Sequence, residues 1–303
     1  MQKRFYSNGK LLITSEYLVL DGAIALALPT KFGQDLVVEQ THRRSINWTS
    51  YDADGSIWLH TELTLDEIAS GETLTLEPAF QRLLSILHQA HLMNPTLLEN
   101  SSGFRVQTHL SFPRFWGLGS SSTLINNVAQ WFGINAYELL HKTFGGSGYD
   151  IACAQNDSAI LYQRNENKPF VKTIEFKPEC AQNIYFVYLN KKQDSRKAIE
   201  SYRANGSPNN ELISTFDQLT QSILTKNDFE SLTQTIQSHE QKLSKILQLP
   251  TVQERLFADF DGVVKSLGGW GGDFVMALNK ANPEAYFKNK GYPTILTYAE
   301  MIA

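Results

Sequence analysis

The chain has few cysteines and no dominant charge, and both absences exclude classes of protein. Its only cysteines are Cys153 and Cys180. Two cysteines are too few for the disulfide framework of a small secreted domain, so a reducing cytoplasm is the simplest expected location. The formal net charge is −4, and charged residues make up 19% of the chain. Without a general excess of basic residues, we do not expect a nucleic-acid partner.

Long apolar runs are also scarce. The most apolar stretch, residues 11–28, is interrupted by Ser15, Glu16 and Asp21. It is therefore too polar to span a bilayer, and no small-residue cleavage site of a signal peptide follows it. We expect no membrane association and interpret the stretch as two buried strands joined by a polar turn.

The chain does contain enough apolar material for a large core. It has 303 residues, of which 42% are hydrophobic, and this favours one large or two medium-sized domains over disorder. Strand-like runs dominate up to about residue 110, and helical periodicity dominates over 210–267. Because these runs do not alternate regularly, the pattern indicates an α+β fold. We expect the domain boundary near residue 175, which gives domains 1–175 and 176–303.

Hydrophobic periodicity also predicts the individual elements. Strands are expected at 10–13, 23–28, 36–38, 104–110, 159–162, 171–176, 184–189 and 273–278. Helices are expected at 77–92, after Gly119, at 136–142 and, in several pieces, over 210–267.

The first of three glycine-rich segments precedes a predicted helix. It consists of Gly117, Leu118, Gly119, Ser120, Ser121 and Ser122. Small residues let the backbone approach a ligand, and the N–H groups at the start of a helix attract phosphate. Serine hydroxyls at this place can also reach a magnesium ion. The alternative is an ordinary serine or threonine N-cap without a ligand.

The other two glycine-rich segments each end in an aspartate. The segment 145–150 ends in Asp150. An aspartate after such a turn can be held close to a ligand, where it would act as a base or as an orienting carboxylate. Its alternative is a solvated turn aspartate that caps the next helix. The segment 268–273 has four glycines in five positions, which indicates a loop that passes close to a ligand or a flexible connection.

Together with Asn8-Gly9-Lys10, the three segments resemble in order the motifs of the GHMP kinase superfamily. This superfamily includes galactokinase, homoserine kinase, mevalonate kinase and phosphomevalonate kinase. Residues 9–20 resemble the N-terminal motif, and 117–122 resemble the phosphate loop. Residues 148–152 read G-Y-D-I-A, the pentapeptide of a GHMP subgroup. The resemblance extends over the full length of the chain.

The resemblance implies a two-domain fold and a set of residue roles. An ATP-binding domain similar to the second domain of ribosomal protein S5 would occupy 1–175, and a ferredoxin-like domain 176–303. Lys10 and Asp150 would be catalytic, and Gly117, Leu118, Gly119, Ser120, Ser121 and Ser122 would contact the phosphates of ATP. Ser121 and Glu138 would hold Mg²⁺, although Glu138 is about one residue out of register with the family's glutamate.

The sequence departs from the family pattern at three further positions. No proline precedes Gly9, Ser15 replaces the usual glycine before Glu16, and Trp270 replaces a glycine of the third loop. The altered third loop and the displaced metal glutamate keep a second function class open, a catalytically weak regulator that binds a nucleotide or metabolite.

The acceptor implied by the resemblance is a small acid of the mevalonate pathway of isoprenoid biosynthesis. The segments G-S-G-Y-D at 146–150 and G-G-D at 271–273 resemble those of phosphomevalonate kinase and favour phosphomevalonate. The expected acceptor contacts are Glu16, Ser147, Lys192, Ser195, Arg196 and Gly269. The basic turn 191–197 would seat a phosphate or carboxylate, and its alternative is a solvated charged loop. Mevalonate, homoserine and sugars remain alternative acceptors. A homodimer is a possible assembly, because the sequence does not fix the oligomeric state.

Overall fold

The computed structural model describes residues 2–165, 168–191, 195–204, 206, 208–226 and 228–303, with only the backbone described at 195–198 and 201. The architecture is α+β, as the sequence predicts. Two compact units are present. The first consists of the residues up to Gly9, Phe32–Arg114 and Leu118–Gln155, and the second of Lys10–Lys31, Phe115–Gly117 and Asn156–Ala303. This division follows compactness alone, so the expected boundary near residue 175 stays a prediction.

The first unit is built on a mixed sheet. Its strands are β3 (Ser45–Tyr51), β4 (Ile57–Thr64), β5 (Phe104–Leu110), and the parts of β1 (Gln2–Leu12) and β2 (Ala25–Gln40) that belong to this unit. The strand order is β4-β3-β5-β2, and β1 pairs with β2. The β2–β5 pair is antiparallel and the β3–β5 pair is parallel. The hairpin β3–β4 was not expected from the sequence.

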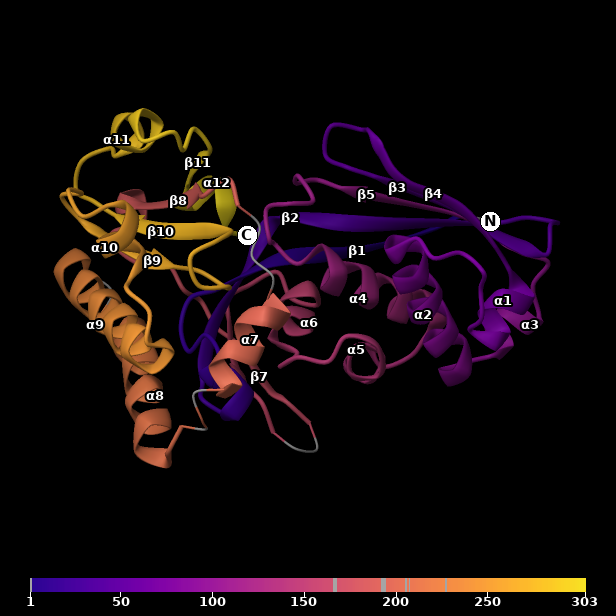
Figure 1. The fold of residues 1–303 in the computed structure, drawn as a ribbon, viewed down its shortest axis with the longest axis horizontal. Helices are drawn as coiled ribbons and strands as arrows, with labels where there is room; N and C mark the ends of the chain where they lie inside the picture. The colour runs from indigo at the N-terminus through magenta and orange to yellow at the C-terminus, as the bar shows by residue number, and fades with distance from the viewer. Residues whose placement is uncertain (1, 166–167, 192–194, 205, 207, 227) are drawn as a thin grey trace. The chain divides into compact units, whose positions relative to one another are not determined.

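Helices cover one face of this sheet, as Figure 1 shows for α2 and α4. The helices are α1 (Leu65–Ser70), α2 (Pro78–Met93), α3 (Thr96–Glu99), α4 (Ser120–Phe132), α5 (Ala136–Thr143) and α6 (Tyr149–Ala154). Alternate strand residues such as Leu36, Val38 and Val106 share one buried core with Leu84 of α2 and Ile125 of α4. This alternation is what a sheet with one covered face requires.

The second unit contains a four-stranded antiparallel sheet in the order β11-β8-β10-β9. Its strands are β8 (Ile184–Tyr188), β9 (Val263–Ser266), β10 (Phe274–Leu278) and β11 (Ile295–Thr297). Every residue of β9 and β10 is buried. In the same unit, residues Ala25–Ala27 of β2 pair with β6 (Ile160–Gln163), which pairs with β7 (Phe170–Thr173).

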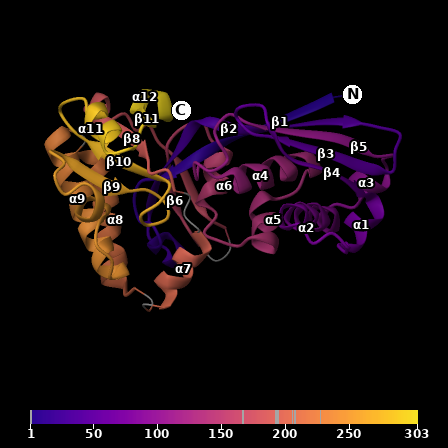
Figure 2. The same cartoon turned by 45° about the horizontal axis from the view of Figure 1, so that its top comes forward.

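Two long helices dominate the rest of the second unit, as the orange ribbons of Figure 2 show. They are α8 (Asn210–Thr225) and α9 (Phe229–Leu247), which pack on each other, while α9 also packs on β9. The shorter elements are η1 (Leu18–Asp21), η2 (Ala181–Asn183), α7 (Ser195–Ala204), α10 (Val252–Leu256), α11 (Glu284–Asn289) and α12 (Tyr298–Met301). Among the described helices, none has both the length and the apolar character needed to cross a membrane.

The predicted helical region ends earlier than expected. Helical periodicity was expected to continue to residue 267, but α10 ends at Leu256 and residues 263–266 form β9. Val263 and Val264, which fit a helical face, lie in that strand. A short apolar run fits either periodicity, and β-branched residues favour a strand.

Candidate functional site

The N-terminus of α4 in the first unit has the features of an anion site. Gly119 is the N-cap, with φ of 92°, and among the described side chains none caps the helix there. The ordinary serine or threonine N-cap is therefore wrong for this helix. Its 13 residues direct the positive end of the helix dipole toward Gly119, and such an N-terminus favours phosphate.

The three serines of the segment differ in what they contact. The hydroxyl of Ser122 is buried and donates to the carbonyl oxygen of Gly119 at 2.8 Å. Ser121 is exposed and Ser120 half-buried. Of these serines, Ser121 is thus the most accessible to a metal ion.

Buried side-chain amides fix α4 within the first unit. The amide of Asn127 donates to the carbonyl of Gln34 in β2 at 2.9 Å and accepts from the hydroxyl of Ser7 in β1 at 2.7 Å. Asn126 donates to Ser7 at 2.9 Å and accepts from Gln155 at 2.9 Å. The network ties the helix to two strands and to the end of α6. Two adjacent asparagines within a predicted apolar helix could have indicated this hydrogen-bond network, and sequence reasoning missed them.

The predicted carboxylates lie on helices that pack against α4. Asp150 is in the first turn of α6, after Gly148 with φ of 89°, and it is half-buried. One of its oxygens accepts from the Ile151 N–H at 3.0 Å. Glu138 is exposed on α5. Near these groups, burial and the charges of Cys153 and Asp150 raise the pKa of Tyr137.

In the second unit, Lys10, Gly117 and Asp273 lie together. The ammonium group of Lys10 donates to the carbonyl oxygen of Gly117 at 2.8 Å. Gly117 has φ of 70°, and a Cβ built on it would lie 2.2 Å from Cγ of Asp273. The Asp273 N–H donates to the carbonyl of Lys191 at 2.7 Å, so the basic turn begins beside this group.

Aromatic packing holds the residues before Gly117. The ring of Trp116 packs edge-on against Phe274, with the centroids 5.4 Å apart. The hydroxyl of Tyr188 donates to the Phe115 carbonyl at 3.0 Å. Both contacts join segment 115–117 to the four-stranded sheet, and Asp273 immediately precedes β10 of that sheet.

The third glycine loop, 268–273, is held at several points and is not a simple flexible connection. Trp270 is 6% exposed. Its backbone N–H donates to the hydroxyl of Tyr17 at 2.9 Å, and its indole donates to the carbonyl of Pro250 at 3.1 Å. A Cβ at Gly271 would lie 2.3 Å from the guanidinium of Arg255. The tryptophan that departs from the family pattern therefore anchors the loop.

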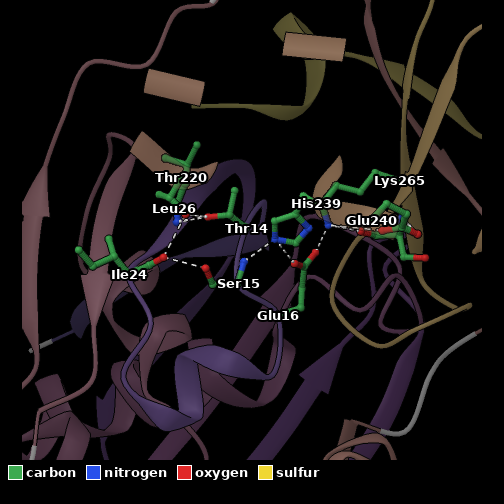
Figure 3. A network of polar contacts seen from close by, with 10 residues as sticks. Thr14, Ser15, Glu16, Ile24, Leu26, Thr220, His239, Glu240 and Lys265 are labelled. Carbon is green, nitrogen blue, oxygen red and sulfur yellow. Dashed lines mark hydrogen bonds and ion pairs between the residues drawn. The ribbon is translucent and has the colours of Figure 1, made fainter. Parts of the chain in front are cut away.

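Glu16 lies in a buried polar cluster (Figure 3). It is 2% exposed, and Lys265 of β9 donates to its Oε1. Lys265 also donates to the carbonyl of Ser266 at 2.8 Å and lies 3.9 Å from Glu240 of α9. His239 of α9 accepts from the backbone N–H of Ser15 at 2.8 Å. Sequence reasoning missed Lys265, His239 and Glu240, although a lysine after two valines in a buried strand was a signal.

Burial sets the protonation of this cluster. It raises the pKa of Glu16 from 4.5 to about 7, although the charge of Lys265 opposes the shift. It raises the pKa of Glu240 in the same way. Burial and the Lys265 charge lower the pKa of His239 well below 6.5. His239 is therefore neutral, and because its Nε2 accepts a hydrogen bond, its proton lies on Nδ1.

The remaining predicted contacts are placed only in part. Lys192 lies outside the described residues, and Ser195 and Arg196 are described only as backbone of α7. Ser147 is half-buried and Gly269 is buried.

Within the described part of the chain, no group of three or more His, Cys, Asp or Glu side chains is arranged to hold a metal ion. The hydroxyl of Ser121 and the carboxylates of Asp150 and Glu138 are donor types that suit Mg²⁺, which usually keeps waters and substrate phosphates as its other ligands.

No protein-family model and no curated protein matches the chain. Solved structures do match it over nearly the full length. Mevalonate kinase from Methanococcus jannaschii matches with a TM-score of 0.68 and 16% identity, covering 98% of this chain and 96% of the other. Phosphomevalonate kinase from Streptococcus pneumoniae, in complex with phosphomevalonate and AMPPNP, matches with a TM-score of 0.69 and 16% identity, covering 97% and 99%. Galactokinase from Lactococcus lactis, complexed with galactose, matches with a TM-score of 0.70 and 14% identity, covering 98% and 92%.

These matches give the chain the fold shared by GHMP kinases. The two-domain α+β architecture expected from the motifs is thereby confirmed. The neighbours differ in their acceptors, so the fold does not identify the acceptor of this chain.

Proposed function

We propose that the protein is a magnesium-dependent kinase that transfers the γ-phosphoryl group of ATP to a small acid. The observation that carries the proposal is the start of α4, where a glycine N-cap leaves the helix without a side-chain cap among the described residues. The GHMP kinase fold supports it, and the phosphomevalonate kinase neighbour binds the ATP analogue AMPPNP. Phosphoryl transfer depends mainly on positioning and charge neutralisation, which this type of site supplies.

The proposal assigns roles to the phosphate loop, the metal ligands and the two catalytic residues. Residues 117–122 contact the phosphates through their backbone, and Ser121 and Glu138 contribute ligands to Mg²⁺. Bound Mg²⁺ would neutralise charge on the phosphates. Lys10, which the Gly117 carbonyl holds at 2.8 Å, supplies a positive charge for the reacting groups. Asp150 orients the acceptor and, for an alcohol, takes its proton.

We propose an acid of the mevalonate pathway as the acceptor, with phosphomevalonate favoured. The G-S-G-Y-D and G-G-D segments support this choice. The basic turn starts at Lys191, whose carbonyl accepts a hydrogen bond from the Asp273 N–H at 2.7 Å. A guanidinium can bind phosphate through two parallel hydrogen bonds, which assigns Arg196 to the acceptor phosphate. The expected place of action is the cytoplasm.

The test is an ADP-release screen with ATP, Mg²⁺ and one acceptor at a time: mevalonate, phosphomevalonate, homoserine and galactose. We expect turnover with phosphomevalonate above the others. A preference for another acceptor would keep the kinase and reject the acceptor. ATP binding without turnover on any of them would instead support the catalytically weak regulator.

A further inference from the structure

A buried polar cluster joins three segments of the second unit that are far apart in the sequence. Glu16 follows β1, Lys265 lies in β9, and His239 and Glu240 lie next to each other on α9. The lysine is 0% exposed and the three other side chains are at most 3% exposed. Figure 3 shows the side chains directed toward one another. A buried cluster of charges costs desolvation free energy, so its stability contribution is a weak reason for its presence.

The segment held by the cluster has a strained backbone. Ser15 has φ of 62° and Tyr17 has φ of 64°, and neither is glycine. The Ser15 N–H is held by His239, and its hydroxyl donates to the carbonyl of Ile24 at 2.8 Å. Glu16 lies between the two strained residues and is held by Lys265. Such conformations persist only where the surroundings fix them.

The same cluster holds the base of the third glycine loop. The Ser266 N–H donates to Glu240 at 3.1 Å, and the Lys265 ammonium donates to the Ser266 carbonyl at 2.8 Å. Ser266 pairs with Val275 of β10, two residues after Asp273. At the tip of the loop, Trp270 donates to the hydroxyl of Tyr17, the neighbour of Glu16. The loop is therefore fastened at both its base and its tip to the segment that contains Glu16.

We propose that Lys265 is a positioning residue: by binding Glu16 and supporting the base of the third glycine loop, it keeps Asp273 against Gly117, whose carbonyl holds Lys10. This inference rests on the proposed kinase function and adds a residue that acts through the loop without touching ATP or acceptor. It also gives Glu16 a positioning role, and the expected acceptor contact of Glu16 stays a prediction.

The charges of the cluster agree with this role. Lys265 faces two carboxylates, Glu16 and Glu240, with neutral His239 and the hydroxyl of Tyr17 nearby. One ammonium group neutralises one carboxylate, and burial favours a proton on the other. Loss of Lys265 would remove the only cation among these groups and the donor that reaches both Glu16 and the Ser266 carbonyl.

The experiment compares Lys265→Met with Lys280→Met and with the double variant Lys265→Met/Glu16→Gln. Lys280 pairs with Glu230 at 2.6 Å in the same unit, with both side chains mostly exposed, so it controls for loss of a lysine–glutamate pair. The double variant removes Glu16, the carboxylate that Lys265 binds directly, and leaves Glu240, whose raised pKa favours its protonated form, so we expect it to fold even if the single variant is unstable. Amide hydrogen exchange over 266–274 and the kcat and KM for ATP are measured for each.

We expect about tenfold faster exchange over 266–274 in Lys265→Met, with no change in Lys280→Met. We expect kcat to fall about tenfold or more with an almost unchanged KM for ATP, because misplaced groups act on the chemical step. The double variant should regain thermal stability but keep the fast exchange and low kcat. Wild-type exchange and kcat in the stable double variant would show a merely structural role and overturn the proposal.

The measurements distinguish loss of the kinase function from loss of the positioning role. If the wild type shows no turnover with any acceptor, the kinase function is rejected, while the exchange measurement still decides whether Lys265 holds the loop. If the wild type is active and Lys265→Met matches Lys280→Met in exchange and kcat, the kinase function stands and the positioning role is rejected.

Discussion

The carboxyl group of Asp273 lies directly against the α-carbon of Gly117. A Cβ at position 117 would lie 2.2 Å from Cγ and 2.4 Å from Oδ2 of Asp273. Two constraints therefore favour glycine at position 117: its backbone φ of 70° and the close approach of the Asp273 carboxyl group. A methyl group at this position would displace Asp273 or the peptide whose carbonyl binds Lys10.

Gly117→Ala should accordingly lower kcat by roughly 10²-fold, the scale expected when catalytic groups are misplaced by about 1 Å. Gly133→Ala is the matched control, because Gly133 has φ of 66° and no described atom lies within 4 Å of its added Cβ. Both variants bear the left-handed strain, about 1–2 kcal/mol, but only the first has the clash. Equal kcat values for the two variants would contradict the role of the Asp273 contact.

Ser15 occupies a left-handed position that the family fills with glycine. Ser15→Gly removes the strain of φ 62° and the hydrogen bond to Ile24, and these effects oppose each other. We expect the free energy of unfolding, measured with urea, to change by less than about 1 kcal/mol. Ser15→Val should lower it by about 2 kcal/mol or more, because a β-branched residue tolerates this conformation poorly. A valine variant as stable as the glycine variant would show that the backbone here is not strained.

Local signals account for most of what the sequence predicts correctly. The glycine before a run of serines locates the start of α4, and the apolar spacing locates α2 and α5. These features depend on neighbours within a few residues. The α+β class follows from the order of strand and helix runs, and the motifs identified the shared fold.

Long-range pairing explains what sequence reasoning missed. Lys265 and Glu16 are 249 positions apart, so no local pattern joins them. The motif that contains Glu16 predicts an acceptor contact for it. Its burial beside Lys265 favours a positioning role, and its acceptor contact stays a prediction. The sequence predicts helix over residues 263–266, which form a strand, because two valines fit both periodicities.

The accessibility of Ser121 predicts a specific magnesium effect. Ser121→Ala should lower turnover about tenfold at limiting Mg²⁺, with little change in nucleotide affinity. Ser122→Ala is the control, since the Ser122 hydroxyl already donates to Gly119 and is buried. ADP release against Mg²⁺ concentration and binding of a fluorescent ATP analogue separate the two effects. Identical magnesium dependence in Ser121→Ala and the wild type would remove Ser121 as a metal contact.

The cluster around Glu16 predicts a pH dependence of stability. The folded protein holds the Glu16 proton up to about pH 7, whereas the unfolded chain releases it near the ordinary pKa of 4.5. The folded state thus binds more protons between these values, and its stability falls as pH rises, by at most about 1.4 kcal/mol per pH unit. His239 acts in the opposite direction, because its lowered pKa leaves the unfolded chain with more protons below pH 6.5.

Comparison with Glu16→Gln isolates the carboxyl group from His239. The stability of the wild type relative to this variant should decrease from pH 5 to pH 7 and become constant above pH 7. Urea unfolding at pH 5, 6, 7 and 8 measures the difference. A difference that does not change with pH would mean that Glu16 titrates at its ordinary value.

Asp150 provides the sharpest test of the chemistry. Asp150→Asn keeps the size of the side chain but cannot take a proton, so kcat for an alcohol acceptor such as mevalonate should fall by roughly 10²-fold or more. Asp66→Asn is a matched control, because Asp66 is also in the first turn of a six-residue helix and is exposed.

A phosphomonoester is already largely dianionic near neutral pH, so the loss of kcat in Asp150→Asn should be smaller for phosphomevalonate. Steady-state kinetics with both acids measures the two losses. If Asp150→Asn retains nearly full activity with both acids, the proton-abstraction role is wrong, and positioning and charge neutralisation would have to account for the turnover.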